Sequence, residues 1–449
     1  MILCHRSFAA SRPFGALRLA CLVLGAAGAL ARPSDVRAAG GAARTPPAFI
    51  TLSAVGPLPT ALARALLPLE VPTPGVGPGS LTLTDVVYCG PRDGSSARLL
   101  ATARPGAIAA LPAATLTEAD CEASLPQVSA RLSSSEGAPA WLVATTLELS
   151  WTPWRLAVRV VDAASAARDP ARADEGRAAA KALSTGGAPL LTVSTAGLIV
   201  ELDAGRTASF NLAFSWGARR VDVVAVPTRQ ARDFAPTRRP LSPLPSLGGS
   251  APRPGNVVAQ LPDAAVNALA SSTFDSRPLS LAADGGTAYT LSRLRLRSEA
   301  GAAELTGIVA TDDASFPATA TFRGKGDLRL ERVEASRPSE ACAAGDYSCV
   351  AGRVLLYGAA ASLAEQLTRQ YEGVPLRAIV GEQRFPVRAS GRSSCAGVTL
   401  LGARAEAGRL LVYGDVTFEE SLGAGKPARC QSPAAPPGPA TKKRTSRAR

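Results

Sequence analysis

Residues 398–416 read VTLLGARAEAGRLLVYGDV, and this stretch decides the fold class. Two runs rich in β-branched and aliphatic residues, 398–403 and 409–416, flank the turn residues Glu406, Ala407 and Gly408. Two such runs separated by a few residues that include glycine are typical of an antiparallel hairpin. We therefore predict a long β-hairpin near the end of the chain.

The same kind of pattern recurs along the chain. Residues 198–202 and 207–214 predict a second hairpin around Asp203, Ala204 and Gly205. Elsewhere apolar and polar residues alternate, which marks half-buried strands because side chains switch face at every residue. We predict a mainly β (α+β) fold of two mostly antiparallel β domains with a few short packing helices. The alternating runs are 81–84, 155–160, 293–297 and 328–331.

Helical patterns are few. Residues 359–371 place Leu363, Leu367 and Tyr371 at i, i+4 and i+8, and a glycine and a proline follow as stop signals. Residues 163–183 are rich in alanine and arginine but contain Pro170, so we expect a broken surface helix or a mobile excursion there. Shorter helices are expected at 59–67 and 262–271.

A proline-rich segment divides the chain. Residues 227–254 hold seven prolines, which remove backbone donors and exclude this segment from the interior of a sheet. We predict a linker here between a β-rich domain at 45–226 and a second β-rich domain at 255–424 that contains the helix 359–371. Residues 425–449 are basic and are expected to form a disordered tail.

The two halves share a coarse order. Each opens with an apolar strand, passes to a short helix beside a proline and closes with a long hairpin, which suggests a degenerate duplication. In outline this layout is similar to elongated lipid-binding folds that wrap a curved sheet around a long helix, although no motif residue carries the likeness.

The first 38 residues predict a secretory signal. Three arginines precede the apolar run 19–31, and small residues offer cleavage sites after Ala31 or Ala38. The alternative is an uncleaved N-terminal anchor. We expect no transmembrane span once the signal is removed, and a secreted, periplasmic or other cell-envelope location. Because His5 is the only histidine, cleavage leaves a mature chain without imidazole.

The lack of histidine argues against triad chemistry, since no Ser-His or Cys-His base is available. We therefore expect a non-catalytic binding or structural protein that needs no cofactor. A carrier of an apolar or lipid-like ligand is the narrower version of this expectation. One alternative is a hydrolase using carboxylates or a metal, for which Asp312-Asp313 and Glu419-Glu420 are the adjacent acids. Another is a glycan-binding surface adhesin that uses Trp141, Trp151, Trp154 and Trp216.

Six cysteines follow the predicted signal, and an even number in an exported chain predicts disulfides. The last four show no paired C-x-x-C spacing and have no histidine to help, so we expect no metal site. Six cysteines allow 15 pairings, of which we predict Cys89–Cys121, Cys342–Cys349 and Cys395–Cys430, a set that keeps each bridge within one half.

Most of the net charge of +13 lies at the two ends. Residues 1–38 carry a net charge of +4 and the tail 425–449 carries +7, so the rest is close to neutral. The tail can attract an anionic lipid or another envelope polymer, but without aromatic residues it predicts no specific nucleic-acid partner.

Two sets of side chains are candidate binding residues. Arg293, Arg295 and Arg297 alternate along a predicted strand, about 7 Å apart on one face, where they could bind an anion or remain a solvated surface. The apolar face of the helix at 359–371, with the leucines of two strands, could line a ligand cavity or pack as a solid core. That set is Leu294, Leu296, Leu328, Leu330, Leu363, Leu367 and Tyr371.

Native mass spectrometry with and without reductant tests the export prediction. We expect a chain that begins after residue 31 or 38 and gains two hydrogens for each disulfide reduced. A full-length chain whose mass does not change on reduction would contradict both export and oxidation.

Overall fold

A computed structural model gives the fold. It describes residues 49–64, 67–73, 79–92, 96–106, 115–185, 187–203, 206–228, 255–274, 279–282, 288–310, 315–336, 346–380, 382–389 and 392–420. The predicted signal, nearly all of the predicted linker and the predicted tail lie outside these residues.

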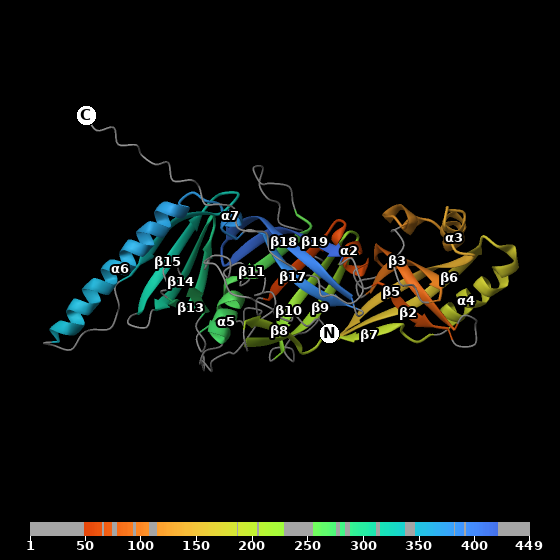
Figure 1. Cartoon of the computed structure of the whole chain (residues 1–449), viewed down its shortest axis with the longest axis horizontal. Helices are drawn as coiled ribbons and strands as arrows, with labels where there is room; N and C mark the ends of the chain where they lie inside the picture. Colours follow the sequence, from red (N-terminus) through yellow and green to blue (C-terminus); the bar gives the residue numbers. More distant parts are fainter. Residues whose placement is uncertain are drawn as a thin grey trace, which may run out of the picture.

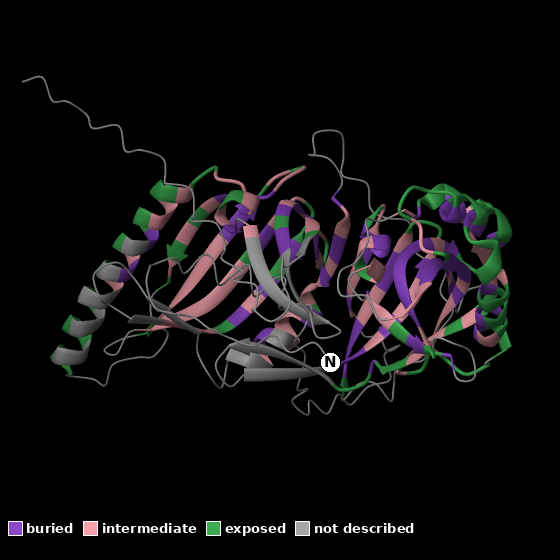
Figure 2. Ribbon diagram, turned by 45° about the vertical axis from the view of Figure 1, so that its right-hand side comes forward, coloured by how far each residue is buried: buried purple, intermediate pink, exposed green. Residues whose placement is uncertain are grey.

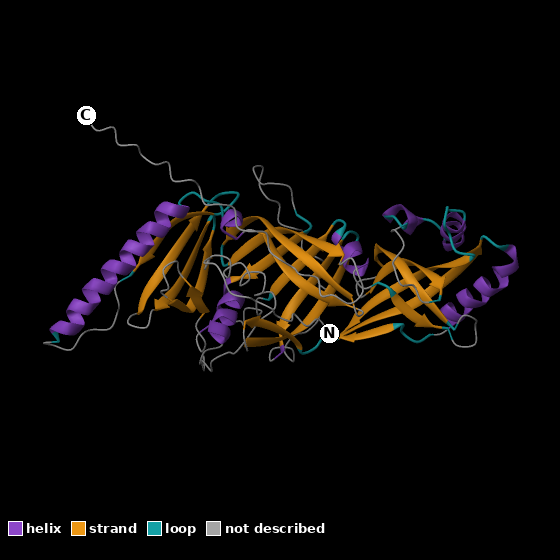
Figure 3. Cartoon of the chain, viewed as in Figure 1, coloured by secondary structure: helices purple, strands orange, loops and turns teal. Residues whose placement is uncertain are grey.

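Three antiparallel sheets follow one another along an elongated body (Figures 1 and 3). The fold is mainly β, as the alternating patterns predict. The middle sheet has eight strands and contains both predicted hairpins. In spatial order its strands are β17 (Glu382–Ala389), β18 (Arg392–Glu406), β19 (Arg409–Glu420), β11 (Val257–Pro262), β1 (Ile50–Val55), β10 (Arg220–Pro227), β9 (Arg206–Gly217) and β8 (Leu198–Asp203).

Strands from the two halves of the chain meet at the centre of this sheet. Strand β1 pairs with β10 on one side and with β11 on the other, with Ser53 opposite Val258. The backbone N–H of Val55 donates to the carbonyl oxygen of Asn256 at 2.8 Å, which extends the ladder. The two halves therefore share one continuous sheet.

The order of elements is matched between the halves. Reading outward from the centre, β1, β10, β9 and β8 on one side correspond to β11, β19, β18 and β17 on the other. In both halves a short helix follows the first strand and a sheet of five or six strands comes before the final hairpin. The two halves therefore share one order of elements, and a duplication stays a prediction.

The first lobe is the six-stranded sheet with its helices. Apolar clusters cover both faces of its central strands β3, β4 and β5, so that β3, β4 and the first half of β5 are almost fully buried. Its elements are α2 (Leu58–Arg64), β2 (Leu69–Pro72), β3 (Ser80–Pro91), β4 (Ser96–Pro105), η2 (Glu118–Glu122), α3 (Leu125–Ser133), β5 (Trp141–Thr152), β6 (Arg155–Ala167), η3 (Pro170–Arg172), α4 (Ala173–Thr185) and β7 (Leu191–Ser194).

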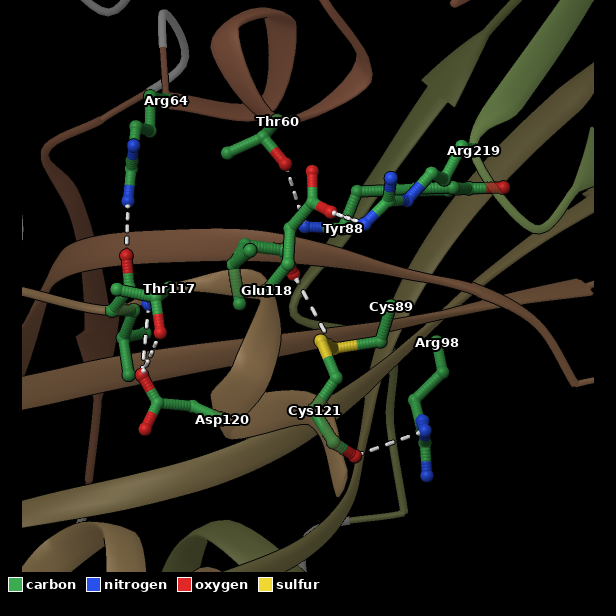
Figure 4. Close-up of a disulfide and its surroundings, with 12 residues drawn as sticks. Thr60, Arg64, Tyr88, Cys89, Arg98, Thr117, Glu118, Asp120, Cys121 and Arg219 are labelled. Atoms are coloured by element: carbon green, nitrogen blue, oxygen red, sulfur yellow. Dashed lines mark hydrogen bonds and ion pairs between the residues drawn. A yellow bond between two sulfur atoms is a disulfide. The ribbon is translucent and has the colours of Figure 1, made fainter. Parts of the chain in front are cut away.

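A disulfide joins Cys89 on β3 to Cys121 in η2, as the cysteine spacing predicts. Beside it, Arg98 donates to the carbonyl oxygen of Cys121 at 3.1 Å, and Arg219 forms a 2.6 Å ion pair with Glu118 (Figure 4). These contacts hold η2, and α3 after it, against the sheet. The other two predicted pairs, Cys342–Cys349 and Cys395–Cys430, fall outside the described side chains.

The buried carboxylate of Asp85 fixes the segment that leads into η2. It accepts hydrogen bonds from the backbone N–H groups of Thr115 and Leu116 at 2.7 Å each and from that of Val86 at 2.8 Å. Arg64 completes the set with a 2.8 Å ion pair. A buried charge is tolerated when its oxygens are paired in this way, so Asp85 acts as a structural anchor.

The second lobe is the five-stranded sheet with its helices. It lies at the opposite end of the body from α3 and α4 (Figure 1). No described helix is both long and apolar enough to cross a membrane. Its elements are α5 (Asp263–Phe274), β12 (Leu279–Ala282), β13 (Ala288–Glu299), β14 (Ala302–Ala310), β15 (Ser315–Arg323), β16 (Arg329–Ala335), α6 (Tyr347–Tyr371) and α7 (Leu376–Val380).

Two helix predictions need correction. The helix predicted at 359–371 ends at Tyr371 as expected, but it begins twelve residues earlier, at Tyr347. Residues 163–167 are not helical: they continue β6 and pair with β5, so that Ser165 lies opposite Val143. Pairing with β5 outweighs the helix propensity of the alanines, and the helix α4 begins only after Pro170.

Removal of the disulfide should loosen the first lobe selectively. For C89S/C121S we expect the free energy of unfolding to fall by about 2–4 kcal/mol, because a bridge that spans 32 residues restricts the unfolded chain. The four tryptophans lie in the first half, so tryptophan fluorescence in urea reports on it. Hydrogen exchange should quicken in α3 and stay unchanged in α6; an unaltered urea midpoint would contradict the prediction.

Candidate functional site

The five-stranded sheet has one apolar face, which we call the inner face. Along β14 and β15 every second residue points to it, and opposite pairs match, such as Leu305 with Ala320 and Val309 with Phe316. None of its described members is charged. They are Leu291, Leu294, Leu296 and Ser298 on β13; Ala303, Leu305, Gly307 and Val309 on β14; Phe316, Ala318, Ala320 and Phe322 on β15; and Leu330, Val333 and Ala335 on β16.

Burial decreases along the inner face. Near the middle sheet, Leu296, Phe322 and Leu330 are buried in a core shared with strands β11 and β19. Toward the other end, Val309 and Phe316 are only half-buried. Figure 2 shows the contrast, because the second lobe is coloured mainly as intermediate, whereas the central strands β3 and β4 of the first lobe are coloured mainly as buried. The inner face therefore contains an apolar region without a complete cover.

Two side chains of α5 attach this helix to β13: the carboxylate of Asp263 accepts from the N–H of Ser298 at 2.5 Å, and Asn267 forms two further hydrogen bonds. The side-chain nitrogen of Asn267 donates to the carbonyl oxygen of Leu296 at 2.8 Å, and its oxygen accepts from the N–H of Leu296 at 2.6 Å. Behind this clamp, Ala270 packs against Leu294 in a small apolar cluster. The clamp holds α5 along one border of the inner face.

The helix α6 is attached to the opposite border by a threonine. The hydroxyl of Thr368 accepts from the N–H of Val333 at 2.8 Å, and it lies 3.2 Å from the carbonyl oxygen of the same residue. Just beyond the helix, Gly373 and Val374 exchange backbone hydrogen bonds with Leu330. These bonds cover the outer edge of β16 and fix the C-terminal end of α6.

Gly307 on β14 leaves space on the inner face for two leucine side chains of β13. A Cβ atom placed on Gly307 would lie 3.0 Å from Cδ2 of Leu294 and 3.1 Å from Cδ1 of Leu291. Both leucine side chains therefore lie directly over this position. Since only glycine leaves that space, Gly307 allows the two leucines to lie flat against the sheet.

Most of the seven predicted ligand residues gather at this site. Leu296, Leu328 and Leu330 are buried in one core cluster, and Tyr371 packs on its edge. Leu294 is buried in the neighbouring cluster with Ala270. Leu367 is half-buried, and the side chain of Leu363 is not described. Their burial shows packing contacts, and their role as ligand contacts stays a prediction.

Sequence analysis missed the residues of the half-buried region. Leu305, Val309 and Phe316 were not selected, although residues 302–310 and 315–323 contain the alternation that would have placed them on one face. A search for alternation in each predicted strand would have found them. Their position beyond the buried part of the face depends on the fold.

The arginine row is interrupted by a β-bulge. The register of β13 shifts between Ser292 and Arg295, and Arg293 has a positive φ of 50°. Arg295 donates to the carbonyl oxygen of Leu294 at 2.7 Å, and Arg297 forms a 2.8 Å ion pair with Glu299. Regular alternation, from which the spacing of the three arginines was inferred, does not hold here. Anion binding by them stays a prediction.

Two of the four tryptophans are buried and the other two are half-buried. Trp141 and Trp216 are buried in the apolar cluster of the first lobe, and the indole N–H of Trp141 donates to Glu175 at 3.2 Å. Trp151 and Trp154 are half-buried and meet edge to face at 6.0 Å. The four do not form the exposed row on which glycan stacking would depend.

The acidic residues of the described part form no metal cluster. No group of three or more His, Cys, Asp or Glu that could hold a metal ion occurs among the described residues. Asp312 and Asp313 lie outside them, as do the side chains of Glu419 and Glu420. The hydrolase alternative therefore gains no support from the described residues.

Among the residues that the structure describes, three groups have displaced pKa values, and burial is the largest cause of each shift. Burial raises the pKa of Tyr88, whose hydroxyl donates to the carbonyl oxygen of Gly217 at 2.7 Å. Burial also raises the pKa of Tyr413 and lowers that of Arg104, where Asp85 partly opposes the shift. None of these residues lies on the inner face, so the shifts indicate structural burial.

Comparison with known proteins gives no relative. No protein-family model matches the chain, and no curated protein matches it. The function must therefore be inferred from the structure.

Replacing Gly307 with a larger residue tests whether Leu291 and Leu294 pack directly over it. We expect Gly307→Val to lower the stability of the protein by about 1–3 kcal/mol, because the new side chain must displace Leu291 and Leu294. Thermal unfolding followed by circular dichroism measures the effect. Thr306→Val on the opposite face of β14 is the matched control and should change stability by about 0.5 kcal/mol or less. Equal effects of the two variants would contradict this account.

Proposed function

We propose that this protein is a non-catalytic binding protein of the cell envelope or the extracellular space that carries an apolar, lipid-like ligand on the inner face of the second lobe. The observation that carries the proposal is the half-buried apolar region of β14 and β15, between the borders formed by α5 and α6. Ligand sites of carriers are concave and mostly apolar, with few polar groups.

The first lobe provides the comparison. Its strands β3 to β5 correspond in order to β13 to β15, yet there the apolar clusters cover both faces. On β5 the large side chain of Trp141 fills this interior, packed beside Gly176 of α4. Along β15 of the second lobe, alanine side chains such as Ala318 stand at inner positions that are only half-buried. The sheet of the first lobe is thus packed on both faces, while the half-buried end of the inner face in the second lobe supports our proposal of a guest molecule there.

The chemistry of the inner face selects the ligand. Its described members are aliphatic, aromatic or small, and the charged side chains of these strands, such as Glu304 and Arg323, belong to the opposite face. A charged ligand group would lose its hydration there without gaining a partner. A hydrocarbon chain loses nothing and gains about 25 cal/mol for each Å² of apolar surface removed from water.

The disulfide supports a location outside the cytosol. Disulfides persist mainly in oxidising compartments outside the cytosol, and Cys89–Cys121 is present in the first lobe. Together with the predicted signal segment at 1–38, it supports an exported protein.

A charge placed on the inner face should abolish binding. We expect Val309→Asp to weaken the binding of a fluorescent long-chain fatty acid at least tenfold, about 1.4 kcal/mol, since the carboxylate would lie against the hydrocarbon chain. Titration of the purified protein by fluorescence measures the affinity.

Ile308→Asp is the matched control. Ile308 is the next residue of β14, is half-buried like Val309 and points to the opposite face. We expect this variant to bind within twofold of the unmodified protein, with circular dichroism confirming that both variants are folded. No binding by the unmodified protein, or equal losses in the two variants, would overturn the proposal.

A further inference from the structure

Exposed apolar side chains lie at the N-terminal end of α6, where the helix leaves the sheet. Tyr347, Val350 and Val354 are 84%, 50% and 66% exposed. They are three and four residues apart, so they lie on one face of the helix. We call these three residues the α6 stripe. In Figures 1 and 2 this N-terminal end of α6 extends beyond the strands of the second lobe.

The C-terminal half of α6 has one buried side and one polar side. It buries Ala360 and Ala364 and uses Thr368 to hold β16. On the side that faces away from these residues it carries an exposed ion pair between Glu365 and Arg369. Tyr347 stands about five turns before Glu365, whereas Val350 stands about five turns before Thr368, so the α6 stripe lies between the polar side and the side that holds β16. A surface helix places polar residues on its solvent face, so the α6 stripe indicates a contact outside this chain.

We propose that the α6 stripe docks on a lipid membrane surface. Tyrosine with aliphatic neighbours suits the boundary between head groups and acyl chains. A second copy of the chain fits less well, because a stable dimer buries about 800 Å² on each partner, far more than three side chains supply. The basic residues of the sequence, with a net charge of +7 in residues 425–449, complement an anionic lipid surface.

This inference rests on the proposed function, since a carrier of apolar ligands must reach the membrane that supplies or receives them. The helix α6 also borders the inner face, where Tyr371 and Val333 pack on the same core. Docking through its free end would bring that border to the lipid surface, so the ligand would cross less water during transfer.

Vesicle flotation tests the docking. The purified protein is mixed with vesicles of phosphatidylcholine alone or with phosphatidylglycerol added, and the bound fraction is measured. We expect binding that is stronger on the anionic vesicles and that falls at least tenfold in V350D/V354D. The control S362D/Q366E adds the same charge at exposed positions of the polar half of α6 and should stay within twofold.

Two further measurements separate the outcomes. Fatty-acid binding should be unchanged in V350D/V354D, while V309D should still float with vesicles, so docking and carriage can fail independently. Light scattering of each sample reports the oligomeric state. A dimer of the unmodified protein that V350D/V354D dissociates would overturn membrane docking. Docking would also be overturned if the unmodified protein does not bind vesicles and V350D/V354D has a lower melting temperature, because the chain itself would then cover the α6 stripe.

Discussion

The structure depends on one face of the middle sheet, which packs against both lobes. On β1, Ile50 belongs to the core of the second lobe and Ala54 to that of the first. Strand β9 repeats this division with Phe210 and Trp216. Each of these strands therefore contributes its two ends to different cores. Because side-chain packing is dense and tolerates little displacement, this shared face sets how the lobes are placed, independently of the linker that joins them in sequence.

The two lobes share one order of elements but differ in how completely their sheets are packed. In the first, the disulfide and the buried Asp85 secure a second apolar layer over the sheet, and the result is a solid body. In the second, Asn267 and Thr368 fix two helices at the borders while the region between them stays half-buried. A stable body at one end permits an incompletely packed one at the other, since stability is not uniform across a structure.

Local features could be predicted from the sequence, whereas long-range ones could not. Both hairpins and the end of α6 follow from turn residues, periodicity and stop signals within a few positions. The pairing of β1 with β11 joins residues as distant as Ser53 and Val258, and no local pattern encodes it. The bulge at Arg293 was missed because the alternation of arginine and leucine reads as a regular strand. The seven candidate ligand residues were found as apolar positions, but their degree of burial depends on contacts between distant segments.

The central place of β1 also affects how the chain is made. Synthesis completes the first half before β11 exists, so the nascent chain presents one edge of β1 with its backbone donors and acceptors unpaired. Such an edge is a template for pairing with other chains, and domains generally fold in the order in which they emerge. Until β11 pairs with β1, that edge is therefore open to pairing with other chains.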